Sequence, residues 1–243
     1  MTTATANRTT VTRTAQAASP EIRRFDIYAP IHKALRNFMS DTLLRVGRLD
    51  VDDADECERS LGQVDALLDF CAQHMEHENE FVHTAIGARL PAGAARTADD
   101  HVEHSECIDG LRDELRSLRA ARGEQRERLA LRLYRHLALF VAENFRHMHI
   151  EETVNNAALW AHYTDEEIVE LHHRLLASIP PRGHLEVARW MIAALAPSER
   201  TVVLGEMQRE APPEAFRAVI ELVRPHLDAS GLTKLGRAIG VAG

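Results

Sequence analysis

Two H-x-x-x-E motifs, at residues 74–78 and 147–151, constrain this chain more than any other feature. On an α-helix, side chains four residues apart lie on the same face. Two such pairs on facing helices would present two imidazoles and two carboxylates to one buried site. Four-helix bundles hold pairs of iron or manganese ions in this way. The rest of the chain must then supply the helices and any further ligands.

Composition sets the broad class of the protein. With 243 residues, 45% hydrophobic and 27% charged, the chain suits one large globular domain, or a domain with a smaller companion. The net charge of -8 and the lack of a Lys/Arg block argue against a nucleic-acid partner. No apolar run approaches the ~20 residues of a membrane helix. We expect a cytoplasmic protein with no membrane partner, in which residues 1–20 form a disordered tail without a secretory signal.

The abundance of Ala, Leu, Arg and Glu favours helices, and four long ones are predicted. The first begins near Pro30, which suits a first helical turn. The second covers about residues 55–89. The third opens with His101 and ends before Gly123, and the fourth covers about 124–161. We expect these segments to form an all-α, antiparallel four-helix bundle over residues 21–163.

Apolar residues recur on each predicted helix at steps of three and four, and polar residues interrupt each stripe. The stripes are His32, Leu35, Met39, Leu43 and Val46; then Val64, Leu67, Cys71, His74, Glu78, Phe81 or Val82, and Ala85; then His101, His104, Ile108, Leu111, Leu115 and Leu118; and finally Leu129, Leu133, Leu137, Phe140, Asn144, His147, Glu151, Val154 and Ala158. A polar side chain on such a stripe needs a partner, because burying it alone costs several kcal/mol.

The polar positions occupy matching depths along the four helices. They come early on the first and third helices and late on the second and fourth. Because the second and fourth helices of an antiparallel bundle run opposite to the other two, all four polar patches would meet at one end. The candidate metal ligands are therefore His32, His74, Glu78, His101, His104, His147 and Glu151.

Other interpretations of these residues stay open at this level. A single zinc ion would need only three or four of the candidates, the motifs can lie on solvated helix faces, and His101 can be an ordinary core histidine. Cys71 and Cys107 lie one turn from proposed ligands, either as outer contacts of the site or as ordinary buried thiols. We expect Glu76, Glu80 and Glu152 on solvated faces, unless one replaces a proposed bridge. The remaining histidines are expected at the surface or in incidental positions: His77, His83, His136, His149, His162, His172, His173, His184 and His226.

Residues 164–243 have a different character. Thr164 precedes an acidic first turn, a typical helix start. Shorter helices follow, broken at Pro180-Pro181, at residues 196–198 and at Pro212-Pro213, with a last one near residues 232–239. No ligand-spaced pair recurs there. We expect either a helical extension packed on the bundle or a small second domain, and this region is where a protein partner would bind.

The order of these motifs resembles the hemerythrin/HHE cation-binding domain family. The stretch 31–36, the two H-x-x-x-E motifs and Glu103-His104 carry the resemblance, which covers about residues 25–162. It implies a non-haem di-iron centre bridged by Glu78 and Glu151 that binds or reacts with dioxygen, nitric oxide or peroxide. Manganese is the less favoured metal. The extension is also similar to helical tails that follow this domain in some bacterial members.

The chain departs from the oxygen carriers of that family. The carriers place two histidines four residues apart on the third helix, whereas His101 and His104 are three apart. They also place an aspartate five residues after the last histidine, where this chain has Glu151 four after His147. Two functions therefore remain: a protein that binds or senses dioxygen reversibly, and an enzyme. The enzyme would be an oxidase, a catalase-like scavenger or a factor in nitrosative-stress and iron–sulfur repair, and its acid, base and substrate residues are not identifiable.

Overall fold

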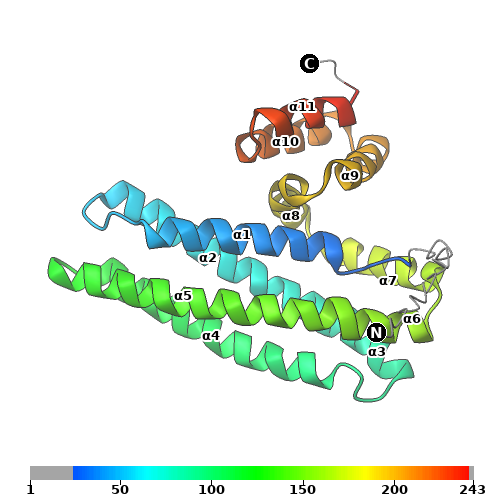
Figure 1. Ribbon diagram of the computed structural model, residues 1–243, viewed down its shortest axis with the longest axis horizontal. Coiled ribbons are helices and arrows are strands. Elements are labelled where there is room, and N and C mark those ends of the chain that lie inside the picture. The colour runs from blue at the N-terminus through cyan, green and yellow to red at the C-terminus, as the bar shows by residue number, and fades with distance from the viewer. Residues whose placement is uncertain (1–23, 241–243) are drawn as a thin grey trace, which may run out of the picture.

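A computed structural model describes residues 24–240 of the chain (Figure 1). The predicted tail over residues 1–20 lies outside the described residues. Every regular element in the described part is helical, so the predicted all-α class is confirmed. No helix there combines the length and apolar character needed to cross a membrane.

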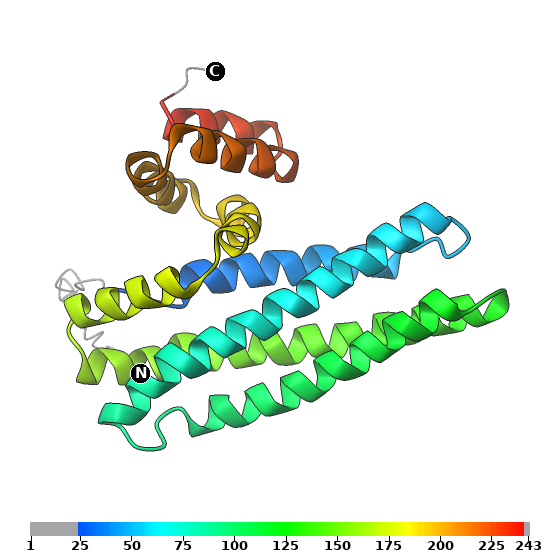
Figure 2. The same cartoon turned by 180° about the vertical axis from the view of Figure 1, so that it is seen from behind.

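Four long helices pack side by side: α1 (Ala29–Gly47), α2 (Ala54–His77), α4 (Ala95–Ala120) and α5 (Glu124–Ile150). Helix α1 contacts α2 and α5, and α4 contacts the same two. Short connections reverse the chain between successive helices (Figures 1 and 2). Local interactions explain where two of these helices begin. Pro30 lies in the first turn of α1, and at the start of α2 the Asp53 carboxylate accepts a hydrogen bond from the Glu56 N–H at 2.9 Å.

The core between these helices consists largely of the predicted stripes. Its buried members are mainly aliphatic, and the predicted residues among them include Leu35, Met39, Val46, Val64, Leu67, Cys71, Ile108, Leu111, Leu115, Leu118, Leu133, Leu137 and Phe140. A uniform helical period was therefore enough to predict the core up to Glu78 on the second long helix and up to Glu151 on the fourth.

Beyond each motif glutamate the helix changes type. The predicted stripe is correct there at Val82, which is buried, but wrong at Val154. A π-helical turn, η1 (Glu78–His83), separates α2 from α3 (Thr84–Arg89), and a second one, η2 (Glu151–Asn155), separates α5 from α6 (Asn156–His162). A π turn contains an extra residue, so the inward face moves one position along the sequence. Ile86 is buried in place of Ala85, and Asn155 in place of Val154, which is 54% exposed.

Shorter helices complete the chain: α7 (Asp165–Ser178), α8 (Pro181–Ala194), α9 (Pro197–Glu210), α10 (Pro213–Val223), the 3-10 turn η3 (Arg224–His226) and α11 (Ala229–Ala238). Thr164 and Glu167 form a capping box at the start of α7. The predicted breaks at the three proline-containing sites are confirmed, because α8, α9 and α10 each begin with a proline.

The C-terminal helices lie on one side of the long helices, next to α1 (Figures 1 and 2). Helix α8 packs along α1, and the Trp190 ring stacks on Phe38 with 4.0 Å between ring centroids. Helices α8 to α11 also share a separate apolar cluster that includes Leu204 and Val223. Trp190 therefore joins the extension to the core of the long helices.

Candidate metal centre

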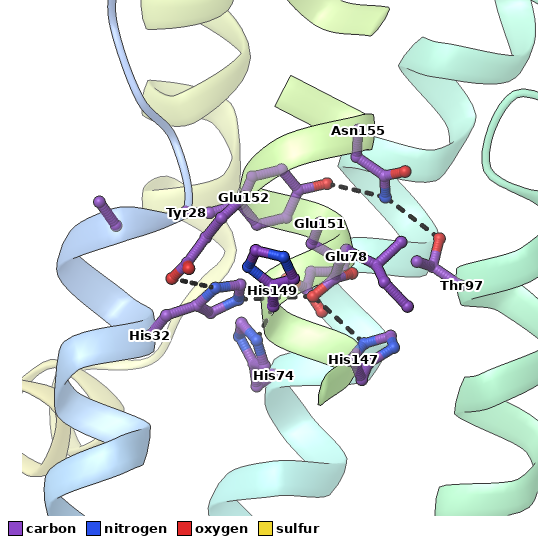
Figure 3. A network of polar contacts seen from close by, with 12 residues as sticks. Tyr28, His32, His74, Glu78, Thr97, His147, His149, Glu151, Glu152 and Asn155 are labelled. Atoms are coloured by element: carbon purple, nitrogen blue, oxygen red, sulfur yellow. Dashed lines mark hydrogen bonds and ion pairs between the residues drawn. The ribbon is translucent and has the colours of Figure 1, made fainter. Parts of the chain in front are cut away.

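The long helices bring the motif residues together near one end. His32 comes from the first turns of α1, His74 from the last turn of α2 and His101 from the early part of α4. His147 belongs to the last turn of α5, and Glu78 and Glu151 are the first residues of the two π turns. The predicted coincidence of depth is thereby confirmed for these six residues, part of which Figure 3 shows.

Two buried carboxylates form the centre of the cluster. Glu78 is 3% exposed and Glu151 is fully buried. The Nε2 atom of His74 lies 3.1 Å from Oε1 of Glu78, and Nε2 of His101 lies 3.5 Å from Oε2 of the same carboxylate. Glu78 thus turns one oxygen toward each half of the cluster.

Glu151 also contacts histidines of both halves of the cluster, two of them through the same oxygen. Its Oε2 atom lies 3.1 Å from Nε2 of His147 and 3.5 Å from Nε2 of His32, while Oε1 lies 3.8 Å from Nε2 of His101. The ligand atoms therefore form two groups that can each hold a metal ion. One group is His32, His74, Glu78 and Glu151, and the other is Glu78, His101, His147 and Glu151. Both carboxylates belong to both groups.

Several buried polar atoms of the cluster have no hydrogen-bond partner among the described residues. They include both carboxylate oxygens of Glu78 and of Glu151, and Nε2 of His32 and of His74. The ion-pair contacts above therefore do not satisfy these atoms as hydrogen bonds. Two ligands that each lie about 2.1 Å from one ion are about 3.0–3.4 Å apart at octahedral or tetrahedral angles. The shorter separations in the cluster match this range, so these atoms could act together as ligands of a cation.

Proton positions strengthen this conclusion. Three of the imidazoles direct Nδ1 at an oxygen outside the two groups, and such outer contacts fix the tautomer of a metal-binding histidine. These outer oxygens can only accept a hydrogen bond, so each of the three imidazoles carries its proton on Nδ1. The lone pair on Nε2 of each ring then faces an oxygen of Glu78 or Glu151, which is also an acceptor. A proton or a metal ion must therefore lie between them. The three contacts are His32 to Glu152 at 3.1 Å, His101 to Asn79 at 2.8 Å and His147 to Asp100 at 3.3 Å.

Electrostatics of the metal-free cluster agree with anionic carboxylates. Burial raises the pKa of Glu78, but the charges of the surrounding histidines, His74 first, outweigh burial and hold the pKa well below its usual value. Burial and the charge of Glu78 raise the pKa of Glu151, and contacts with His147 and His83 still lower it overall. Two buried negative charges side by side attract cations.

The histidines respond in opposite ways. Burial lowers the pKa of His32, but the carboxylates of Glu152 and Glu78 raise it to about 9. Burial and the neighbouring His147 lower the pKa of His104 to about 4. Neighbouring carboxylates therefore outweigh the effect of burial on the pKa of His32, whereas at His104 burial and a neighbouring histidine lower the pKa together.

Glu152 is closer to the site than expected. It was expected on a solvated face, but its Oε1 atom contacts Nδ1 of His32, and both its oxygens accept from the Arg36 guanidinium at 2.5 and 3.0 Å. Glu152 is the second residue of η2, and both contacts are with residues of α1. Glu152 is therefore an outer residue that orients a candidate ligand, while Glu76 and Glu80 are exposed as expected.

His83 was expected at the surface, and this expectation is wrong. Its side chain is buried, its Nε2 atom lies 3.6 Å from Oε1 of Glu151, and its ring stacks on His101 at 4.9 Å. On a regular helix a residue five positions after Glu78 would point away from it, but the π turn brings the two to one face. The sequence carries no periodic signal for this turn.

His104 is buried but belongs to neither ligand group. Its ring lies edge-on to that of His147, with 5.0 Å between centroids, and its Nδ1 atom has no hydrogen-bond partner in the described chain. Its role as a ligand stays a prediction, and the geometry favours His83 for a place beside Glu151.

A pair of substitutions separates these two histidines. We expect His83→Ala to weaken retention of one metal ion by about tenfold, the lower range for outer residues of metal sites, and His104→Ala to change it less. Competition of the loaded protein with a chelator, followed by metal analysis, measures the difference. Loss of an ion in His104→Ala but not in His83→Ala would contradict this assignment.

A polar network covers the carboxylates on one side (Figure 3). The Asn155 amide donates to the Tyr28 hydroxyl at 3.3 Å and to Thr97 Oγ1 at 3.1 Å, and Thr97 Oγ1 contacts Nε2 of His83 at 3.1 Å. Burial, followed by the charges of both cluster glutamates, raises the pKa of Tyr28 well above its usual value. The phenol is therefore neutral and remains a donor next to the site.

The cysteines supply no ligand in the described structure. Cys71 belongs to the apolar core, where burial raises the pKa of its thiol. Cys107 contacts Nε2 of His136 at 3.3 Å rather than a cluster residue. Both thiols lie outside the two ligand groups.

Comparison of the chain with models of known protein families, with curated proteins and with solved structures finds no match. The buried His/Glu cluster that can hold metal ions is therefore the feature on which any functional conclusion rests.

Proposed function

We propose that the protein is a hemerythrin-like, non-haem di-iron protein that binds or reacts with dioxygen or another small oxidant such as peroxide or nitric oxide. In this proposal the four long helices are an antiparallel four-helix bundle of the hemerythrin type. The observation that carries it is that Glu78 and Glu151 each belong to both ligand groups. Shared carboxylates suit two adjacent ions better than one.

The donor set supports iron. Imidazole and carboxylate together suit iron and manganese, and no thiolate of the described chain joins the groups. A single structural zinc ion is satisfied by four ligands and would leave buried imidazoles of the other group without a cation. Manganese fits the same donors and is the less favoured substitute.

The residues of the chain would hold the metal and protect it. Each group contributes four donor residues, which leaves room for an exogenous ligand on ions that accept more than four. When bound, iron would supply the electrons for reversible binding or reduction of the oxidant. Glu152, Asp100 and Asn79 orient imidazoles, and the Tyr28 network keeps donors next to a site that the helices shield from water.

An enzyme is the second candidate function. The observation in its favour is that each ligand group contains only two imidazoles, because His104 lies outside both groups. Fewer protein ligands give a substrate easier access to a metal. Such an enzyme would act as an oxidase, as a catalase-like scavenger, or in nitrosative-stress and iron–sulfur repair.

One experiment tests both functions. The protein is loaded anaerobically with Fe(II), air is admitted, and the visible spectrum is followed. A stable absorption band that disappears under vacuum supports reversible binding, whereas rapid decay with consumption of peroxide or a reductant supports catalysis. Uptake of no iron, or of one zinc ion only, would contradict the proposal as a whole.

A further inference from the structure

Three arginines gather at the opposite end of the long helices from the metal centre. Arg45 lies in the last turn of α1, Arg48 follows that helix, and Arg59 lies in the early part of α2. Arg45 is 13 residues after His32 on the same helix, a separation of about 20 Å along the axis. The cluster is therefore separate from the His/Glu site.

These arginines are unpaired within the described chain. Their guanidinium groups make no ion pair or hydrogen bond with any described residue, and Nε of Arg45 is buried without a partner. Elsewhere on the long helices arginines reach acids readily, as Arg119 of α4 does with Glu58 and Asp65. Three neighbouring arginine side chains without an acidic partner are unusual in a chain of net charge -8.

The arginines line a pocket of about 460 Å³ together with Glu56 and Ser60. Ser60 is fully buried, and its hydroxyl has no hydrogen-bond partner in the described structure. Buried hydroxyls are normally satisfied, so this one is explained by an absent partner. One oxygen of the Glu56 carboxylate accepts the Asp50 N–H at 3.3 Å, so this acid is partly engaged. The three arginines and one glutamate leave a formal charge of +2 around the pocket.

We propose that this pocket binds a small phosphate monoester through its phosphoryl group. A dianion balances the lining charge, and the planar guanidinium group matches phosphate oxygens in a two-pronged geometry. Ser60 supplies a further donor. The volume exceeds that of bare phosphate and falls in the range of small-molecule sites, so it leaves room for an organic group.

Calorimetric titration of the full-length protein with inorganic phosphate, glycerol phosphate and succinate tests the proposal in chloride buffer. We expect saturable binding of both phosphates at one site, with the monoester tighter, and weaker binding of succinate. Arg45→Ala and Arg59→Ala should each weaken binding by at least about tenfold, as expected for loss of a charge-assisted hydrogen bond. Arg96→Ala, which removes an exposed cation near the other end, should leave it unchanged.

Ser60→Ala provides a second measurement that does not alter the net charge. Because the hydroxyl is buried and unpaired, its removal should not lower the melting temperature of the ligand-free protein but should weaken phosphate binding several-fold. Equal weakening by Arg45→Ala and Arg96→Ala would show unspecific attraction and overturn the proposal. Succinate binding as tight as that of the monoester, or no phosphate binding at all, would also overturn it.

Discussion

Glu151→Gln should abolish the binding of both metal ions, and Glu78→Gln should do the same. Each carboxylate belongs to both ligand groups, so one substitution removes a ligand from two sites at once. Each also removes one of the two buried negative charges that offset the charge of the cations. Because loss of an outer contact alone lowers metal affinity 10- to 100-fold, loss of a shared ligand should lower it by more than about 100-fold.

Metal analysis after anaerobic loading and gel filtration measures this effect. His74 belongs to one group only, so His74→Ala should retain about one ion per chain where the wild type retains two. Glu76→Gln is the matched control, because Glu76 is an exposed glutamate two residues before Glu78. Retention of two ions by Glu151→Gln would contradict the shared-ligand arrangement.

Loading with metal should also stabilise the fold. A ligand that binds only the native state at 1,000 times its dissociation constant contributes about 4 kcal/mol. In a chain of this size, 1 kcal/mol shifts the melting temperature by about 2–4 °C, so a rise of roughly 8–16 °C is expected. The physical reason is that the metal-free cluster contains two adjacent buried carboxylates and several unpaired buried atoms.

Thermal unfolding followed by circular dichroism, with Fe(II) or with a chelator under anaerobic conditions, measures the rise. In Glu151→Gln the two melting curves should coincide, which separates binding at the cluster from unspecific binding. A wild-type protein with the same melting temperature in both conditions would show that metal does not bind preferentially to the folded state.

The sequence was sufficient to predict the cluster because two periodic signals agree. The 3.6-residue period placed His32, His74 and Glu78 on core faces, and the antiparallel order of the helices placed them at the same depth. Both signals depend only on local spacing and short connections. The structure brings six of the seven predicted ligands to one place, and His104 lies one turn from His101, outside both ligand groups.

The π turns account for most of what sequence reasoning missed. They begin at Glu78 and Glu151, and after them Ile86 and Asn155 are buried one position beyond the predicted Ala85 and Val154. The π turn therefore brings His83, five residues after Glu78, toward the site, whereas Asn155 lies four residues after Glu151 and shares its face. A π turn is a rare single-turn insertion within an α-helix, so a uniform helical period does not predict it.

The contacts that orient the imidazoles were also beyond prediction from sequence. Glu152 and His32 are 120 positions apart in the chain, and Asp100 and His147 are 47 apart. An acidic residue next to a candidate ligand occupies the same position in the sequence whether its side chain faces solvent or a neighbouring helix. The packing of α1 against η2 decides that Glu152 meets His32, and the packing of α4 against α5 decides that Asp100 meets His147.

The central claim is that two ions share Glu78 and Glu151, and an anomalous-scattering map of iron-loaded crystals tests it most directly. The account predicts two iron peaks per chain, each about 2.0–2.2 Å from an oxygen of both carboxylates. One peak should lie next to His32 and His74, and the other next to His101 and His147. A single peak, or iron bound away from these carboxylates, would contradict it.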